Sequence, residues 1–509
     1  MSYAPYRGDQ TPYESQLIIG REQIEEDLRF LTKYTGCIRT YETSHGLIEV
    51  VPIANQLGIK VLLGAWIGDD ADKNVREVAN AVRLANQYPE TVQALIVGNE
   101  VLLRGEYSPE GLKRLIQSVR AQVTVPVTYA DLWSMWEKYP DVAEVVDFLT
   151  IHTLHYWDNS TKPVDEAARD SLAIAKKIAE QHPGKSVFIG EAGWPSTGRM
   201  RQEALPSLLN QARYVRQLIV AAGQAGTGLN IIEAFDQPWK RKPEGTVGGF
   251  WGVFTTDREV KFPLTGPVRD DPDWKLHFGI AASLGILFTL PIFMTGRRQG
   301  ASAWFMLAIV SQIAGTCLVL AALQGIDASY NPFQWMVWGG RWLLALAAAA
   351  LFPIAYLRTI ADQPVEPLPM RALIAMIERK QLSAHSRLDL ALGAVRALTL
   401  FTAAVTMLCF VFDGRHRDFP VAPYAVPALV FVVLATIRQR KQAVDLAEER
   451  FLAAVLLFGS VVSPLIEGFG NWQALTWAAV CIVLAAGVQL EARGSGWLGL
   501  RSGGRPNEA

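Results

Sequence analysis

Cysteine and charge are both scarce in this sequence. The chain has four cysteines in 509 residues, and only Cys37 lies before residue 300, which excludes a disulfide framework. Charged residues make up 19% of the chain, against about 25% in average soluble proteins. The formal net charge is -1, so nothing in the bulk charge favours a nucleic-acid partner.

Motifs for cofactor chemistry are also missing. No phosphate-binding glycine loop and no nucleotide-sugar motif of a processive glycosyltransferase is present. Asp131, His152 and His155 carry metal-ligand atoms, but the aspartate would come from another strand and no helix repeats the pattern. We therefore expect neither a cofactor nor a metal.

Long apolar runs are confined to the second half of the chain. Most reach the roughly 20 residues that a helix needs to cross the hydrocarbon core, although the sixth is short and contains Pro464. We expect a membrane domain over 276–490 with about seven helices, or six if one run fails to span. The runs are 276–295, 301–323, 335–357, 388–412, 421–437, 450–466 and 472–490.

Basic residues predict the orientation of these helices. If the first helix ends in the cytoplasm, the inner segments hold 14 lysines and arginines and the outer loops hold only Arg415 and Arg417. This bias predicts an inner-membrane, multi-pass protein with its first domain in the periplasm or outside the cell and a cytoplasmic tail over 491–509. The 14 residues are Arg297, Arg298, Arg358, Arg371, Arg379, Lys380, Arg387, Arg438, Arg440, Lys441, Arg450, Arg493, Arg501 and Arg505.

The start of the chain conflicts with this orientation. Residues 1–6 are polar and already resemble a first strand, and no signal peptide precedes them. A missing or mis-assigned upstream segment is favoured over a first helix that acts as a reverse anchor.

Strand-like and helical segments alternate through the first 265 residues. Near-continuous apolar strands are typical of parallel sheets covered on both faces. Eight βα units in about 240 residues have the size and rhythm of a (β/α)8 TIM barrel, an α/β fold. A doubly wound sheet is the rival, but its glycine-rich first turn is absent. The predicted strands are Ser2–Tyr6, Cys37–Glu42, Lys60–Ile67, Val92–Glu100, Val125–Asp131, Asp147–Leu154, Ser186–Gly193 and Asn230–Gln237. A linker over 266–275 joins this domain to the apolar half.

Polar and aromatic residues cluster where these strands end. In a TIM barrel the active site lies at that face, and aromatic rings mixed with polar groups form a surface suited to sugars. Any one of the tryptophans could equally belong to the core. The predicted substrate-binding residues from this pattern are Tyr6, Arg39, Tyr41, Trp66, Asn99, Tyr129, His155, Tyr156, Trp194, Glu233, Asp236 and Trp239.

Two glutamates close buried apolar strands. Glu100 ends the run 94–100 and Glu191 ends the core of 187–191. A carboxylate at the end of such a strand is unfavourable without a functional reason, although either one alone could be a salt-bridge partner. Glycoside cleavage with retention needs two carboxyl groups about 5–5.5 Å apart, and strands four and seven of a barrel face each other across its mouth.

Four motifs resemble glycoside hydrolase family 17, the β-1,3-glucanase and glucanosyltransferase family. They are 38–41, Gly98-Asn99-Glu100, 190–196 and 233–240, in the family's order over residues 1–265. The resemblance implies that Glu100 is the acid/base, that Glu191 is the nucleophile and that Lys240 helps hold the substrate region. Ala192 and Gln237 depart from the usual pattern, which removes a hydroxyl and a carboxylate and puts ordinary hydrolysis of long β-1,3-glucan in doubt.

We therefore expect a membrane-anchored β-glucan transglycosylase that elongates β-1,3-glucan or adds β-1,6 branches. A barrel of this type before several membrane spans resembles bacterial membrane proteins of β-1,3/β-1,6-glucan synthesis. The expected partners are β-glucan, the lipid bilayer and a glucan synthase. A membrane-bound β-1,3-glucanase and a non-catalytic glucan-binding or export component are the alternatives. Arg396, inside the fourth run, is either a functional residue or a side chain that snorkels to the membrane surface or pairs with Asp389.

Overall fold

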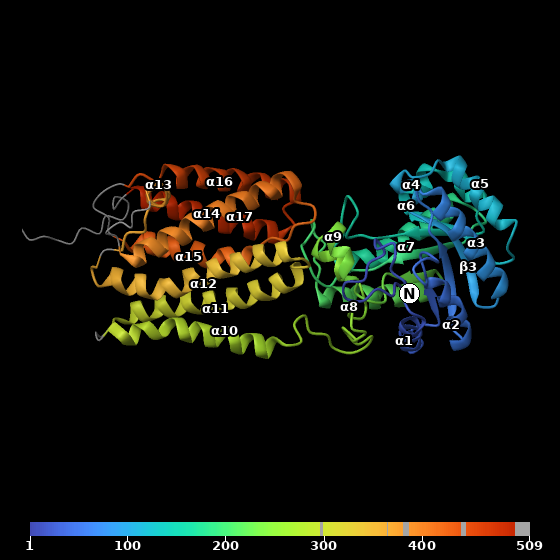
Figure 1. Ribbon diagram of the computed structural model, residues 1–509, viewed down its shortest axis with the longest axis horizontal. Coiled ribbons are helices and arrows are strands. Elements are labelled where there is room, and N and C mark those ends of the chain that lie inside the picture. The colour runs from blue at the N-terminus through green and yellow to red at the C-terminus, as the bar shows by residue number, and fades with distance from the viewer. Residues whose placement is uncertain (296–298, 364, 380–385, 439–443, 494–509) are drawn as a thin grey trace, which may run out of the picture. The chain divides into compact units, whose positions relative to one another are not determined.

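The computed structural model divides the chain into two compact units, Met1–Asp271 and Pro272–Ala509. It describes residues 1–295, 299–363, 365–379, 386–438 and 444–493 (Figure 1). The predicted cytoplasmic tail beyond residue 493 lies outside the described residues. So do seven of the 14 basic residues that predict orientation, namely Arg297, Arg298, Lys380, Arg440, Lys441, Arg501 and Arg505.

The first unit is a parallel barrel. Seven described strands pair in sequence order, each with its neighbour and all in parallel. Seven of the eight predicted strands are thereby confirmed, with shorter bounds than expected at several ends. The strands are β1 (Cys37–Arg39), β2 (Lys60–Ala65), β3 (Val92–Asn99), β4 (Val127–Leu132), β5 (Leu149–His152), β6 (Val187–Ala192) and β7 (Gly228–Ile231).

The N-terminal segment occupies the eighth strand position. The backbone N–H of Ser2 donates to Ile231 of β7, and the N–H of Tyr3 donates to Arg39 of β1. The predicted strand over 2–6 is nevertheless reduced to an isolated bridge between Ser2 and Arg39. Pro5 lacks the N–H that a longer ladder would need, so pairing stops after two residues. The barrel is therefore nearly closed, with seven strands and one short bridging segment.

Helices cover the outside of the barrel. Most buried residues of these helices are apolar, as in α5, where Leu112, Ile116 and Val119 are buried. Ser108 caps the start of α5, where its Oγ accepts a hydrogen bond from the N–H of Gly111. The helices are α1 (Arg21–Leu31), α2 (Val50–Leu57), α3 (Ala71–Gln87), α4 (Val101–Arg104), α5 (Pro109–Arg120), α6 (Trp133–Lys138), α7 (Val164–Gln181), α8 (Leu208–Ala225) and α9 (Arg241–Glu244).

The second unit is a helical bundle. Among the described residues, six helices are long and apolar enough to cross a membrane. The first of the six is Trp274–Phe293, which includes α10 and the helical turn after it. The predicted run 421–437 forms α15, whose 17 residues are fewer than in any of these six spans. The short sixth run is longer than expected, since α16 has 21 residues and continues through Pro464. The helices are α10 (Trp274–Thr289), α11 (Ala301–Ala328), α12 (Pro332–Ile360), α13 (Met370–Arg379), α14 (Arg387–Asp413), α15 (Val421–Ile437), α16 (Ala447–Glu467) and α17 (Trp472–Arg493).

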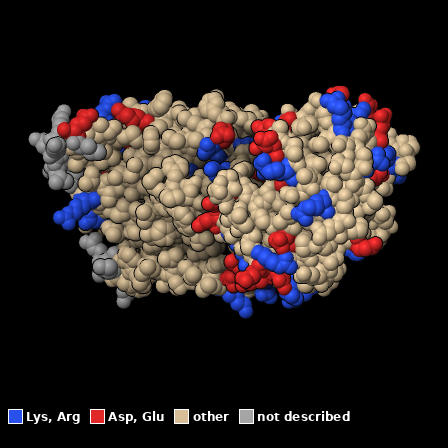
Figure 2. Space-filling view, turned by 45° about the vertical axis from the view of Figure 1, so that its right-hand side comes forward, with Lys and Arg blue, Asp and Glu red and all other residues tan. Residues whose placement is uncertain are grey.

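Apolar side chains lie on the outside of the bundle as well as inside it. Phe305 and Phe458, on α11 and α16, are 68% and 60% exposed. Figure 2 shows few Lys, Arg, Asp or Glu side chains on the visible side of the bundle away from its ends. A bundle whose outer surface is apolar between its ends is suited to a lipid environment.

Arg396 does not pair with Asp389. Its guanidinium bonds Glu449 of α16 at 3.1 Å and Glu491 of α17, while Asp389 binds the backbone N–H of Glu366. Arg438 also binds Glu491, at 2.7 Å. Two arginines and two glutamates therefore form a balanced buried network that joins three helices and the end of α15.

Candidate active site

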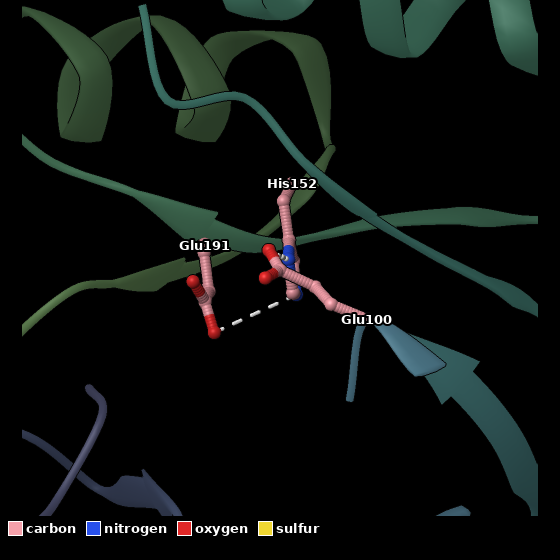
Figure 3. Close-up of side chains that lie close together, drawn as sticks. All are labelled: Glu100, His152 and Glu191. Carbon is pink, nitrogen blue, oxygen red and sulfur yellow. Dashed lines mark hydrogen bonds and ion pairs between the residues drawn. The ribbon is translucent and has the colours of Figure 1, made fainter. Parts of the chain in front are cut away.

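Glu100 and Glu191 lie at the carboxyl ends of facing strands. Glu191 is in β6 and Glu100 follows β3 in a left-handed backbone conformation, with φ 53°. A carboxylate oxygen of each and a ring nitrogen of His152 lie within 4.8 Å of one another (Figure 3). This spacing is close to the roughly 5–5.5 Å of retaining glycosidases.

Arg39 and Tyr41 hold Glu191. Arg39 Nη1 lies 3.2 Å from Glu191 Oε1, and the Tyr41 hydroxyl donates to the same oxygen at 2.8 Å. Arg39 also donates to Asn99 Oδ1 at 2.6 Å and to the carbonyl of Gly190 at 2.7 Å. Arg39 is fully buried below the site, so one guanidinium fixes both the nucleophile candidate and the residue before Glu100.

His152 holds Glu100. A 2.8 Å hydrogen bond joins His152 Nδ1 to Glu100 Oε1, and Nε2 of the same ring lies 3.6 Å from Glu191 Oε1. Burial raises the pKa of the Glu100 carboxyl, but the hydrogen bond and electrostatic attraction of His152, aided by Arg104 and Arg39, outweigh it and lower the pKa. The His152 ring therefore lies within reach of both carboxylates and fixes Glu100 by a hydrogen bond.

A second ionic group borders the cavity. Lys240 Nζ contacts both carboxylate oxygens of Glu233, at 2.7 and 2.8 Å. Burial raises the pKa of Glu233 to about 7 despite the opposing effect of Lys240. Burial also raises the pKa of Glu244, and the charges of Glu100 and Glu191 act in the same direction. Lys240 therefore lies close to two acidic residues of the cavity lining, Glu233 and Glu244.

A cavity of about 530 Å³ opens above the two glutamates. Its volume lies in the range of small-ligand sites, roughly 300–1,000 Å³. Nine of the predicted site residues line it, namely Tyr6, Tyr41, Trp66, Asn99, Glu100, Glu191, Glu233, Trp239 and Lys240. Arg39 lies below it, and Tyr129 lies behind Glu100, where its hydroxyl accepts from the N–H of Leu102 and donates to Asp131.

Four predicted substrate-binding residues lie elsewhere. His155 is buried against α7, with Nε2 bonded to Ser171 Oγ at 2.9 Å. The Tyr156 hydroxyl donates to the carbonyl of Arg199, and Trp194 Nε1 donates to that of Leu205. Asp236 accepts from Lys261 and from the N–H of Gly252. Each of these four side chains is bonded inside the fold, and none lines the cavity.

Three further residues near the strand ends also lie away from the cavity. Trp157 and Trp251 stack on each other with ring centroids 6.5 Å apart and do not line the cavity. Gln237 is fully buried, and its side-chain oxygen accepts from Trp239 Nε1 at 2.9 Å. Having glutamine in place of a carboxylate at position 237 therefore affects the residue that supports Trp239, and it removes no group from the cavity lining.

Several residues that line the cavity were not predicted from the sequence. Glu42 accepts from the Tyr6 hydroxyl at 3.0 Å and lies 3.5 Å from Lys73 Nζ. The Arg104 guanidinium stacks 4.5 Å from the Trp66 ring. Glu42 directly follows Tyr41, so the strand-end rule could have found it, but Lys73 and Arg104 lie on helices, where charged residues carry no such signal.

Glu100, His152 and Glu191 together satisfy the spacing of a metal-binding group. The donor set does not favour a cation, however, because Arg39 Nη1 lies 3.2 Å from the same Glu191 oxygen and 3.3 Å from His152 Nε2. A guanidinium in that position would repel a metal ion and already neutralises the carboxylate.

A parallel barrel with two facing carboxylates at the ends of its strands belongs to the class of barrel glycosidases. A family profile described as the BtgE/BtgC glycoside hydrolase domain matches residues 1–252. A glucan 1,3-beta-glucosidase of Arthroderma benhamiae is 30% identical over 274 residues, which cover 49% of this chain and 86% of the relative. The chain therefore belongs to glycoside hydrolase family 17, and the resemblance predicted from its motifs is confirmed.

Other relatives match the same half of the chain. A glucan 1,3-beta-glucosidase of Saccharomyces cerevisiae is 26% identical over 262 residues, which cover 47% of this chain and 84% of the relative. Among solved structures, a family 17 beta-1,3-glucanosyltransferase from Rhizomucor miehei is 28% identical, with 49% of this chain and 93% of that chain covered and a TM-score of 0.45. All three similarities cover about half of this chain, leaving the other half without a counterpart in them.

Proposed function

We propose that this protein is a retaining β-1,3-glucan transglycosylase anchored in a membrane. The observation that carries the proposal is the pair Glu100 and Glu191, whose carboxylate oxygens face each other within 4.8 Å at the cavity floor. The relatives named glucan 1,3-beta-glucosidase support β-1,3-glucan as the substrate.

The reaction runs through a covalent intermediate. Glu191 attacks the anomeric carbon while Glu100 protonates the departing glycosidic oxygen, and the glycosidic bond breaks as the glucosyl ester forms. Glu100 then removes a proton from the acceptor hydroxyl, whose oxygen displaces Glu191. The two displacements return the carbon to its starting configuration.

The surrounding residues orient this chemistry. Arg39 and Tyr41 bond Glu191 Oε1 and leave the second oxygen to attack. His152 bonds Glu100 and, through this hydrogen bond, helps to lower the pKa of the Glu100 carboxyl.

Aromatic rings on both sides of the glutamates support transfer over hydrolysis. Trp66 follows β2, beside the strand of Glu100, and Trp239 follows β7, beside the strand of Glu191. Sugar rings can stack at both positions, so an acceptor sugar held at one side competes with water for the intermediate. We assign Trp66 to the acceptor side because the leaving group departs past Glu100.

Hydrolysis is the second candidate function, and the names of the relatives favour it. Incubation with a purified laminari-oligosaccharide at millimolar concentration distinguishes the two. Products longer than the substrate, or with a new linkage, support transfer, and a ladder of shorter sugars alone supports a membrane-bound β-1,3-glucanase. Binding without turnover, equal in wild type and Glu191→Gln, would contradict both and favour a glucan-binding or export component.

The bundle is proposed as a multi-pass anchor in the inner membrane, with the barrel in the periplasm or outside the cell. A glucan synthase is the proposed partner, because a tethered transferase can act on glucan as it emerges. A reporter fused after Arg298 is expected in the cytoplasm and one near Asp327 outside, following the distribution of basic residues. Reversed signals would contradict the orientation, since polymeric glucan would be out of reach of the barrel.

A further inference from the structure

The partly buried Arg341 differs from the other arginines that the structure describes inside the bundle. Arg396 and Arg438 bind the carboxylates of Glu449 and Glu491. Arg341 of α12 forms no ion pair with any residue that the structure describes. Its single hydrogen bond goes from Nη2 to the hydroxyl of Thr406 at 3.1 Å. A guanidinium has five N–H donors, so most of its bonding capacity is unused.

Two aromatic residues enclose this cation. The guanidinium carbon lies 4.9 Å from the ring centre of Trp338 and 5.9 Å from that of Tyr424. Trp477 follows, with its ring centre 5.3 Å from that of Tyr424. We call Arg341, Trp338, Thr406, Tyr424 and Trp477 the Arg341 cluster.

The Arg341 cluster has an excess of hydrogen-bond donors. The Tyr424 hydroxyl and the Trp477 indole N–H are both buried, and neither has a hydrogen-bond partner among the described residues. Unpartnered buried donors cost free energy, and here one of them belongs to Tyr424, whose ring lies beside the Arg341 guanidinium. The missing component is therefore an anionic group with several acceptor oxygens.

The position of Arg341 along its helix indicates the source of that anion. α12 has 29 residues, so it is about 43 Å long and exceeds the roughly 30 Å hydrocarbon core by about 7 Å at each end when centred. Arg341 comes nine residues after Pro332, about 14 Å along the helix, and so about 7 Å below the core boundary. An arginine side chain can reach the head-group level from there.

We propose that the Arg341 cluster binds the phosphate group of a membrane lipid. Arg341 is only partly buried, so its guanidinium is reachable, and a guanidinium fork matches two phosphate oxygens. Phosphates of the bilayer lie just above this depth, whereas a free anion would have to leave water to enter it. The inference rests on the proposed membrane location of the bundle.

Lipid binding to the full-length chain tests the proposal. The delipidated protein in dodecyl maltoside is titrated with dioleoylphosphatidylglycerol, and adducts are counted by native mass spectrometry. We expect one tight adduct that Arg341→Gln weakens at least tenfold and Arg341→Lys weakens less. Tyr424→Phe removes only the unpartnered hydroxyl and is expected to weaken lipid binding several-fold. This variant tests the proposal if Arg341→Gln does not fold.

Arg417→Gln is the matched control, because Arg417 pairs with Asp413 at 2.9 Å on an exposed surface. It is expected to leave the adduct unchanged. Equal loss in the Arg417 and Arg341 variants overturns the proposal, as does equal binding of dioleoylglycerol, which lacks phosphate. Displacement by inorganic phosphate at the same concentration overturns the lipid assignment. Carbonate extraction of cell membranes and laminari-oligosaccharide turnover report separately on the membrane location and on the barrel.

Discussion

The barrel and the bundle both bury ionic groups, but they expose them differently. In the barrel, Glu191 is held by a buried arginine and still lines a cavity, and the Glu100 side chain keeps 22% of its surface exposed. In the bundle, Glu449 and Glu491 are held by Arg396 among packed helices, and the Glu449 side chain is fully buried. In both regions an arginine neutralises the buried carboxylates, but only in the barrel does a carboxylate also face a cavity that a substrate can enter.

The difference teaches that burial of a charge does not by itself indicate catalysis. A buried ion pair loses solvation that its attraction barely repays, so it is retained where it fixes a geometry or where a reaction needs it. In the barrel, the carboxylates line an open cavity, so their burial is explained by a reaction. In the bundle, the Arg396 network is buried among packed helices, so its burial is explained by the geometry that it fixes.

Removing the nucleophile candidate is expected to give the largest effect. Glu191→Ala should keep the barrel folded and lose about 10³-fold or more in turnover, because the covalent route is gone. Initial rates on laminari-oligosaccharides measure the loss. Azide should restore turnover with inverted product configuration, since the small anion fills the vacated space and attacks from that side.

Glu100→Ala separates the two roles. It should retain turnover on substrates with good leaving groups, which need no proton from an acid. Inverted azide products from Glu100→Ala, and none from Glu191→Ala, would reverse the assignment of nucleophile and acid.

Breaking the bundle network is expected to affect stability without affecting turnover. Arg396→Leu leaves Glu449 buried without its cation, which costs about 3–5 kcal/mol for a buried pair. Thermal unfolding of the full chain in detergent measures the loss, and the rate on laminari-oligosaccharides should stay the same. The double variant with Glu449→Leu should recover much of the stability, because Arg438 and Glu491 remain paired. A lower rate on laminari-oligosaccharides in Arg396→Leu, restored together with the stability in the double variant, would mean that the barrel depends on the bundle.

Much of the site followed from the sequence because strand ends in a barrel share one face. Glu100, Glu191 and Trp66 needed only the strand positions to be placed at that face. His155 and Trp194 were misplaced because an aromatic or polar residue at a strand end can turn into the fold. Their partners, Ser171 and Leu205, lie 16 and 11 residues further along the chain, and no local pattern identifies them.

Long-range pairing limited the prediction in the bundle as well. Asp389 was a reasonable partner for Arg396 from sequence distance alone, but two helical turns separate them. Glu449 and Glu491 are 53 and 95 residues away and meet Arg396 only through helix packing. In the barrel, the strand over 2–6 failed for a local reason, the missing N–H of Pro5.

The pH dependence of barrel stability gives a smaller test. The folded barrel raises the pKa of Glu233 from 4.5 to about 7, so between these values the native state holds a proton that the unfolded chain lacks. The free energy of unfolding should therefore fall as pH rises through this window, by at most about 3 kcal/mol from this group. Urea unfolding of residues 1–271 at pH 5 and pH 7.5 measures the slope.

Glu233→Gln should reduce that slope. Asp131, Asp236 and Glu244 also have raised pKa values and should leave a residual slope of the same sign. Glu137→Gln is the control, because a hydrogen bond from Lys177 lowers the pKa of Glu137 and its removal should not flatten this window. An unchanged slope in Glu233→Gln would contradict the raised pKa.

The smallest expected effect concerns the choice between acceptor and water. Trp66 lines the cavity on the side of Glu100, and its ring is supported by the Arg104 guanidinium at 4.5 Å. Trp66→Ala should lower the ratio of transfer to hydrolysis several-fold while donor cleavage changes little, because stacking of the acceptor contributes about 1 kcal/mol or slightly more. Product analysis at equal donor conversion measures the ratio. Trp239→Ala, on the side of Glu191, should instead slow donor cleavage and leave the ratio nearly constant. If both variants change only the overall rate, the two rings do not separate donor from acceptor, and the transfer proposal loses its structural support.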